Sequence, residues 1–326
     1  MTDANLHFNP HPLARNPHFQ TIIGSRVRPV RPALEAAARE MILHVPVGEG
    51  VRLQGFYSPQ PDGGGRGLAL MLHGWLGSAN STYIVAIGEY LFRRGYAIFR
   101  LNLRDHGDTV ALNEGMFHGC LLEEVFQAAR QAAALEAERP FFILGFSMGG
   151  NFALRLAWLH AERPIPNLRH VVAVSPSINP ITTLAALDNS SPLYRYYFLH
   201  HWRRKLREKQ AAFPHRYDFT DVLAMNRSWD IGEVIIPRYT EFTNSADYYA
   251  CYAVTPEKMA ALTVPTTIIT ARDDPMIPVD DFAALEGVNP HLRLAIQPYG
   301  GHVGFVDLFP FRRWLNGAIA ALLEDV

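Results

Sequence analysis

Short, continuous apolar runs recur along the chain and alternate with segments whose apolar residues are spaced as in helices. The runs 68–72 and 141–144 are typical of strands that helices cover on both faces. Two earlier runs, 40–46 and 51–58, flank the glycine-containing turn 48–50 and indicate a hairpin. The other predicted strands are 97–103, 170–174, 266–270 and 292–297, and the predicted helices are 83–93, 121–137, 151–160 and 309–323.

This alternation of strand and helix predicts an α/β protein with a mostly parallel, eight-stranded sheet and helices on both faces. The segment 176–263 breaks the rhythm and is far longer than a bare loop of about 15 residues. We therefore expect it to be a mainly helical cap inserted into a core domain formed by residues 40–175 and 264–326. Residues 1–39 contain several prolines and little periodicity, so they are expected to form an arm lying over the core.

The sequence Gly145-Phe146-Ser147-Met148-Gly149 lies between a predicted buried strand and a predicted helix. In that context G-x-S-x-G is typical of a nucleophile elbow, a strained turn that lifts the serine hydroxyl clear of the sheet. The glycines leave the space that such a turn requires. Ser147 is therefore the candidate nucleophile.

A serine hydroxyl needs a base, and the base needs an acid that orients it. On this architecture the chain order is serine, acid, histidine, and both partners are expected just after strands. Asp273 and Asp274 follow the strand 266–270, and His302, flanked by glycines, follows the strand 292–297. We expect His302 to be the base and Asp274 its partner, because Pro275 restricts the backbone of Asp274 towards extended geometry. Asp273 is the alternative acid, or a brace that bonds to nearby backbone.

An oxyanion hole is expected from two backbone N–H groups. One belongs to Met148, the residue after the nucleophile, and the other to the loop that follows the strand 68–72. In that loop Trp75 comes after the pair His73-Gly74 and is the candidate donor, while His73 is expected to brace the loop.

The composition narrows the choice of partners and location. A formal net charge of -1 gives no overall attraction to nucleic acid, and no partner of that kind is expected. Only two cysteines, Cys120 and Cys251, are present, which fits a reducing compartment and predicts a cytoplasmic protein. No apolar run is long enough for a signal peptide or a membrane span.

The elbow segment and the residues around His302 resemble those of the α/β-hydrolase superfamily. The resemblance covers nearly the whole chain from about Met41 onward. The segments 16–22 (NPHFQTI), 145–151 (GFSMGGN) and 300–305 (GGHVGF) together look like the YheT-type hydrolases, bacterial relatives of abhydrolase-domain lipid hydrolases. The resemblance implies carboxylester hydrolysis without a cofactor or metal, and a triad of Ser147, Asp274 and His302. It does not extend into the cap beyond Asp247-Tyr248-Tyr249.

The sequence thus predicts a serine carboxylester hydrolase acting on small-molecule or lipid esters of short to medium chain length. An acyltransferase or thioesterase with the same triad stays open, as does a binding protein that has lost the reaction. The cap combines an aromatic stretch at 194–198 with a basic run at 203–209. That combination indicates either a solvated helix over an aromatic core or a peripheral contact with lipid headgroups. The oligomeric state is not predicted.

Overall fold

The computed structural model describes residues 6–27, 30–61 and 64–325. An eight-stranded sheet runs through the molecule in the order β1-β2-β4-β3-β5-β6-β7-β8. The first two strands are antiparallel to their neighbours, and the other pairs are parallel. The predicted α/β architecture is thereby confirmed. The strands are β1 Arg39–Val45, β2 Val51–Ser58, β3 Gly67–Leu72, β4 Tyr96–Leu101, β5 Phe141–Phe146, β6 Leu168–Val174, β7 Thr266–Ala271 and β8 Leu292–Gln297.

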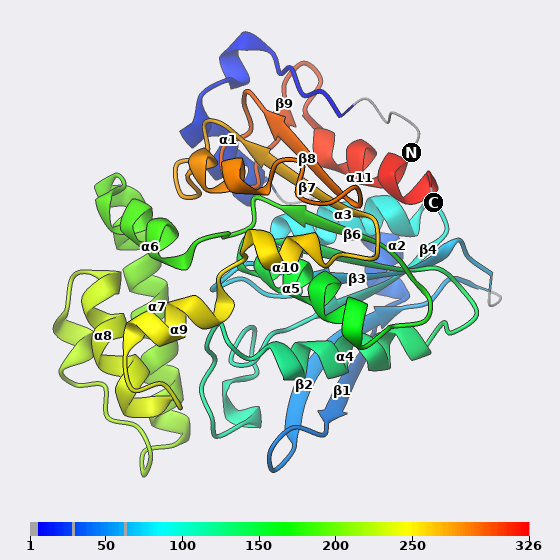
Figure 1. The fold of residues 1–326 in the computed structure, drawn as a ribbon. Helices are drawn as coiled ribbons and strands as arrows, with labels where there is room; N and C mark the ends of the chain where they lie inside the picture. Colours follow the sequence, from blue (N-terminus) through cyan, green and yellow to red (C-terminus); the bar gives the residue numbers. More distant parts are fainter. Residues whose placement is uncertain (1–5, 28–29, 62–63, 326) are drawn as a thin grey trace.

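Helices cover both faces of the sheet (Figure 1). Helices α4 and α5 pack with one cluster of buried side chains, and α3 and α11 pack with a second cluster on the opposite face. Every residue of β3, β4, β5 and β7 is buried, which explains their continuous apolar sequences. The helices are α1 Pro17–Arg26, α2 Pro32–Ala36, α3 Thr82–Phe92, α4 Leu122–Ala134, α5 Met148–Glu162, α6 Pro180–Asn189, α7 Pro192–Ala212, α8 Ser228–Tyr239, α9 Ser245–Tyr252, α10 Pro256–Ala260 and α11 Trp314–Glu324.

Helices α6, α7, α8 and α9 form a group beside the sheet, here called the cap (Figure 1). Its interior holds a cluster of aromatic and aliphatic side chains that includes Leu206, Phe219 and Ile231. Helix α10 lies instead against α5 of the core. The boundaries predicted for the inserted segment, residues 176 and 263, stay a prediction.

A buried ion pair anchors the cap to the core. The Lys209 ammonium on α7 lies 2.9 Å from an Asp105 carboxylate oxygen and donates to the backbone carbonyls of Asn113 and Gly115. Asp105 follows β4, and its other carboxylate oxygen accepts the N–H of Phe117. A buried charge is tolerated when it is paired and fully hydrogen-bonded in this way.

Several elements differ from the sequence prediction, among them the short helix α2 in the arm, which was not predicted. The last helix begins at Trp314 and not near Phe309, because residues 306–307 and 312–313 pair as the short strands β9 and β10. Within the arm, residues 17–26 form the helix α1, which the sparse apolar pattern did not predict. Among the described residues, no helix is long and apolar enough to cross a bilayer.

Candidate active site

Ser147 occupies the sharp turn between β5 and α5. Its φ of 54° lies in the left-handed region, which a residue with a side chain rarely adopts. The neighbouring backbone is crowded: a Cβ placed on Gly145 would lie 2.2 Å from the carbonyl oxygen of Gly149, and one on Gly149 would lie 2.2 Å from that of Leu72. Only glycine fits at these two positions, so the turn and its flanking glycines form one steric unit.

His302 bridges Ser147 and Asp274. Its Nε2 atom lies 3.0 Å from Ser147 Oγ, and its Nδ1 atom lies 2.9 Å from Asp274 Oδ2. The Asp274 side chain is fully buried, and its Oδ1 atom accepts the N–H groups of Met276 and Ile277. These bonds fix the carboxylate so that one oxygen faces the imidazole. The structure therefore brings the three residues expected from the sequence into one hydrogen-bonded chain.

Asp273 has a different set of contacts from its neighbour. Its Oδ1 atom accepts the N–H of Gly301, the residue before His302. Burial raises the pKa of the Asp273 carboxyl. Asp273 thus braces the loop that carries His302, while Asp274 contacts the imidazole itself.

The loop after β3 passes directly over Ser147. A Cβ on Gly74 would lie 3.1 Å from the Cβ of Ser147. Within the described part of the chain, the N–H of Trp75 donates to no protein acceptor. The N–H of Met148 is among the first of α5, which have no acceptor inside the helix. Both groups are thus available to a substrate oxygen, while the indole of Trp75 packs on Phe198 and Trp202 of the cap.

Two buried histidines hold this loop in place. His73 accepts the N–H of Leu103 at Nε2 and donates from Nδ1 to the carbonyl oxygen of Gly74. His106 accepts the N–H of Leu76, which has a φ of 61°. Burial lowers the pKa of His73 to about 4 and that of His106 well below its ordinary value. Both rings are therefore uncharged at neutral pH and support the loop through their hydrogen bonds. The histidine that hydrogen-bonds Ser147 is His302.

A cavity of about 770 Å³ lies at this site, with walls from the core, the cap and α1. Its described lining contains no Asp or Glu, and most of it is aliphatic or aromatic. From the core it includes Ser147, Met148, Trp75 and His302. From the cap and α1 it includes Leu184, Leu187, Leu193, Tyr194, Phe198, Trp202, Ile235, Ile236, Tyr248, Tyr249, Tyr252, Thr21, Ile22 and Arg26.

Helix α1 is the part of the site that the sequence reasoning missed. Thr21 Oγ1 accepts the backbone N–H of His302 at 2.9 Å. A local signal for the helix was present, since Asn16 and Pro17 are a favoured N-cap and first-turn pair. Helix α1 is therefore a wall of the site.

Comparison with known proteins agrees with this fold. Residues 69–307 match the family described as "alpha/beta hydrolase fold". The chain belongs to the alpha/beta hydrolase fold family. This hydrolase is 24% identical over 256 residues to YheT, a predicted esterase of Escherichia coli (strain K12), with 77% of this chain and 74% of YheT covered. The resemblance to YheT-type hydrolases is thereby confirmed.

Two further similarities agree with the family and the fold. The hydrolase is 26% identical over 294 residues to slr0264, a predicted esterase of Synechocystis sp. (strain ATCC 27184 / PCC 6803 / Kazusa), with 82% and 78% of the two chains covered. The solved structure of the Pyrococcus furiosus esterase Pf2001 superposes with a TM-score of 0.59 at 16% identity, covering 98% of this chain and 97% of that one. At that identity the superposition supports the fold alone.

Proposed function

We propose that the hydrolase is a carboxylic ester hydrolase in which Ser147 is the nucleophile, His302 the general base and Asp274 the residue that orients His302. The observation that carries this proposal is the continuous chain Ser147 Oγ–His302 Nε2 and His302 Nδ1–Asp274 Oδ2. The similarity to predicted esterases supports the choice of an ester as substrate.

The geometry supports a two-step reaction. Ser147 Oγ attacks the ester carbonyl carbon while His302 Nε2 takes the hydroxyl proton, and Asp274 stabilises the resulting imidazolium. The negative oxygen of the tetrahedral intermediate accepts the N–H groups of Trp75 and Met148. The intermediate then expels the alcohol, which takes the proton from His302. Water, activated by the same imidazole, hydrolyses the acyl-enzyme to the acid and restores Ser147.

The cavity supports an acyl group of medium length. Ligand sites of 300–1,000 Å³ suit small molecules, and mostly apolar walls favour a hydrocarbon chain. Each methylene that enters such a pocket gains up to about 0.8 kcal/mol, which corresponds to roughly a fourfold increase in kcat/KM. The gain ends when the chain fills the space beneath the cap.

A series of p-nitrophenyl esters of increasing acyl length tests this function. We expect kcat/KM to rise from acetate to medium-chain esters and then to fall, and Ser147→Ala to abolish turnover throughout. A steady decline from acetate onward would show that the cap closes the acyl pocket. Failure of every ester would contradict the esterase proposal itself.

A peripheral contact between α7 and a lipid surface is the second part of the proposal. The first turns of α7 expose Leu193, Tyr196 and Tyr197, which are 61%, 68% and 48% exposed. Leu193 and Tyr197 also line the cavity. The helix carries six Lys or Arg residues and one Glu, and five of the six cations remain when Lys209, buried in its ion pair with Asp105, is set aside. Exposed apolar side chains on a basic helix at the edge of the cavity suit an anionic lipid surface that holds the ester.

Sedimentation with vesicles of phosphatidylcholine and phosphatidylglycerol tests this contact. We expect Tyr196→Asp to bind anionic vesicles several-fold more weakly than the wild type, while its hydrolysis of soluble esters is unchanged. Ile42→Asp is the matched control, because Ile42 is an exposed apolar residue on β1, 38% exposed. Equal binding by both variants and the wild type would refute a lipid contact through α7.

A further inference from the structure

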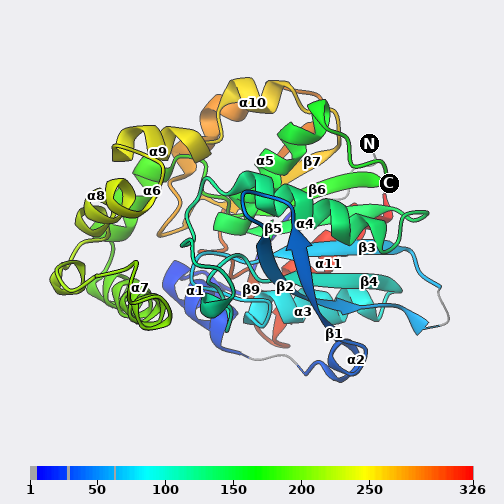
Figure 2. The ribbon, with the colours of Figure 1, turned by 90° about the horizontal axis from the view of Figure 1, so that it is seen from below.

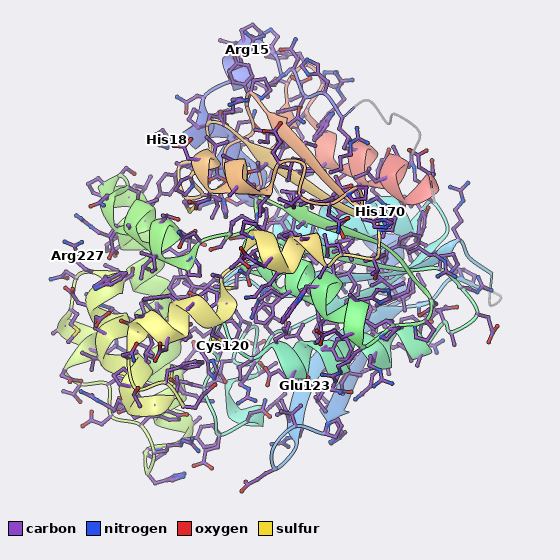
Figure 3. The ribbon with its side chains drawn as sticks, in the orientation of Figure 1. Arg15, His18, Cys120, Glu123, His170 and Arg227 are labelled. Carbon is purple, nitrogen blue, oxygen red and sulfur yellow. The ribbon has the colours of Figure 1, made fainter. Side chains whose placement is uncertain are left out.

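The segment that resembles a YheT-type motif, residues 16–22, forms the start of α1. Asn16 caps this helix by accepting the N–H groups of His18 and Phe19, and Pro17 occupies its first turn. Figure 2 shows α1 beside α7 of the cap, and Figure 3 shows His18 on the side of α1 that faces the cap. The His18 imidazole hydrogen-bonds the Tyr194 hydroxyl of α7 at 3.0 Å. Helix α1 thus lies between the cap and the loop of His302.

A buried glutamine ties α1 to the chain just after His302. The Gln20 side chain has no exposed surface. Its amide oxygen accepts the N–H of Val306, and its amide nitrogen donates to the carbonyl oxygens of Val306 and Ala14. Every polar atom of the side chain is therefore used to dock α1 onto the segment that follows the histidine.

The glycines around His302 allow this docking. A Cβ on Gly301 would lie 2.5 Å from the carbonyl oxygen of Pro17, and a Cβ on Gly304 would lie 2.4 Å from that of Gln20. Gly301 also has a φ of 53°, a conformation that suits glycine. The glycines on both sides of His302 therefore allow the close approach of α1, in addition to leaving the imidazole free to reach Ser147.

Thr21 makes the contact nearest to the imidazole. Its hydroxyl donates to the carbonyl oxygen of Pro17 at 2.8 Å and accepts the backbone N–H of His302 at 2.9 Å. We infer that Thr21 is a positioning residue for His302, which makes α1 part of the catalytic machinery. The inference rests on the proposed function, because it assigns a role to Thr21 only through the histidine.

The loop around His302 needs such support from outside. Val303 and Phe305 have φ values of 58° and 46°, a conformation that is energetically costly for a residue with a side chain. Contacts from neighbouring elements must offset this cost. A shift of about 1 Å in a catalytic group can lower the rate by about 10²-fold. The bond from Thr21 is therefore expected to act on the rate more than on substrate binding.

Two substitutions of Thr21 separate positioning from packing. Thr21→Val keeps the shape of the side chain but removes the acceptor, whereas Thr21→Ser keeps the acceptor. We expect Thr21→Val to lower kcat for a soluble ester by about 10- to 100-fold with KM within about threefold. Thr21→Ser is expected to retain near-wild-type kcat. Thr266→Val is the control. Thr266 is the first residue of β7, and its buried hydroxyl donates to the carbonyl oxygen of Val264, at the end of the strand opposite to Asp273 and Asp274.

A second readout does not depend on turnover. The NMR signal of the His302 Nδ1–H, assigned by its loss in His302→Gln, reports on the hydrogen bond to Asp274. We expect it to shift or broaden in Thr21→Val and to return in Thr21→Ser. An unchanged signal and unchanged kcat in Thr21→Val would overturn the inference, as would equal losses in the Val and Ser variants. If the wild type hydrolyses no ester but the His302 signal still changes in Thr21→Val and returns in Thr21→Ser, the proposed function fails and the positioning role of Thr21 stands.

Discussion

At the scale of single residues, hydrogen bonds assign different tasks to Asp273 and Asp274. Asp274 uses one carboxylate oxygen for two backbone N–H groups and the other for His302. Asp273 uses an oxygen for the N–H of Gly301. The chain order and the restriction by Pro275 favour Asp274 in the sequence. The sequence leaves the choice open because which carboxylate faces the imidazole depends on a turn whose bonds are formed only in the fold.

The exchange of each aspartate for asparagine tests this division. In Asp274→Asn the amide oxygen would keep the hydrogen bonds from the N–H groups of Met276 and Ile277, so the NH₂ group would face His302. The NH₂ group would donate to Nδ1 and leave the imidazole proton on Nε2, which could then no longer accept the proton of Ser147. We expect a loss of about 10⁴-fold in kcat, the size seen for the equivalent change in another serine hydrolase. Asp273→Asn keeps an acceptor for Gly301, and we expect a loss below about tenfold. Steady-state kinetics on one soluble ester would check both values, and the reverse order would assign the role to Asp273.

At the scale of elements, the sequence predicts the strands well because a strand that is buried on both faces has a continuous run of apolar residues. The predicted runs 68–72 and 141–144 lie within β3 and β5, and the candidate groups follow β3, β5, β7 and β8. Groups at the carboxyl ends of parallel strands share one edge of the sheet, so the site could be predicted from chain order.

Helix α1 could not be found by the same reasoning. Only Gln20 and Gly24 of this helix are buried, so it has no apolar stripe that a periodicity search would detect. Its attachment depends instead on the polar side chains Gln20 and Thr21 and on the close approach of glycines. These contacts join segments about 280 residues apart, and no local pattern specifies them.

At the scale of the whole molecule, buried histidines link stability to pH. Burial lowers the pKa of His73, His118 and His170 to about 4 each. The ordinary value is about 6.5, so between pH 6.5 and 4 the unfolded chain binds protons that the folded chain does not. The contribution of these groups to the free energy of unfolding therefore falls as the pH is lowered through this window.

Urea unfolding at several pH values measures this effect. Each such histidine contributes a slope of up to about 1.4 kcal/mol per pH unit between its two pKa values. We expect stability to decline from pH 6.5 to 4.5 and His170→Gln to reduce the slope. His44→Gln is the control, because His44 is exposed on β1. A slope that is the same in both variants as in the wild type would contradict the assignment to buried histidines.

Stoichiometric labelling with a fluorophosphonate tests most directly whether Ser147 is the nucleophile. Ser147 lies 3.0 Å from His302 Nε2 on a turn that only flanking glycines allow. Intact-protein mass spectrometry should show one added phosphonyl group, loss of esterase activity in proportion to labelling, and a peptide modified at Ser147. Ser147→Ala should fold and take up no label. Labelling that persists in Ser147→Ala, or that leaves activity intact, would contradict the account.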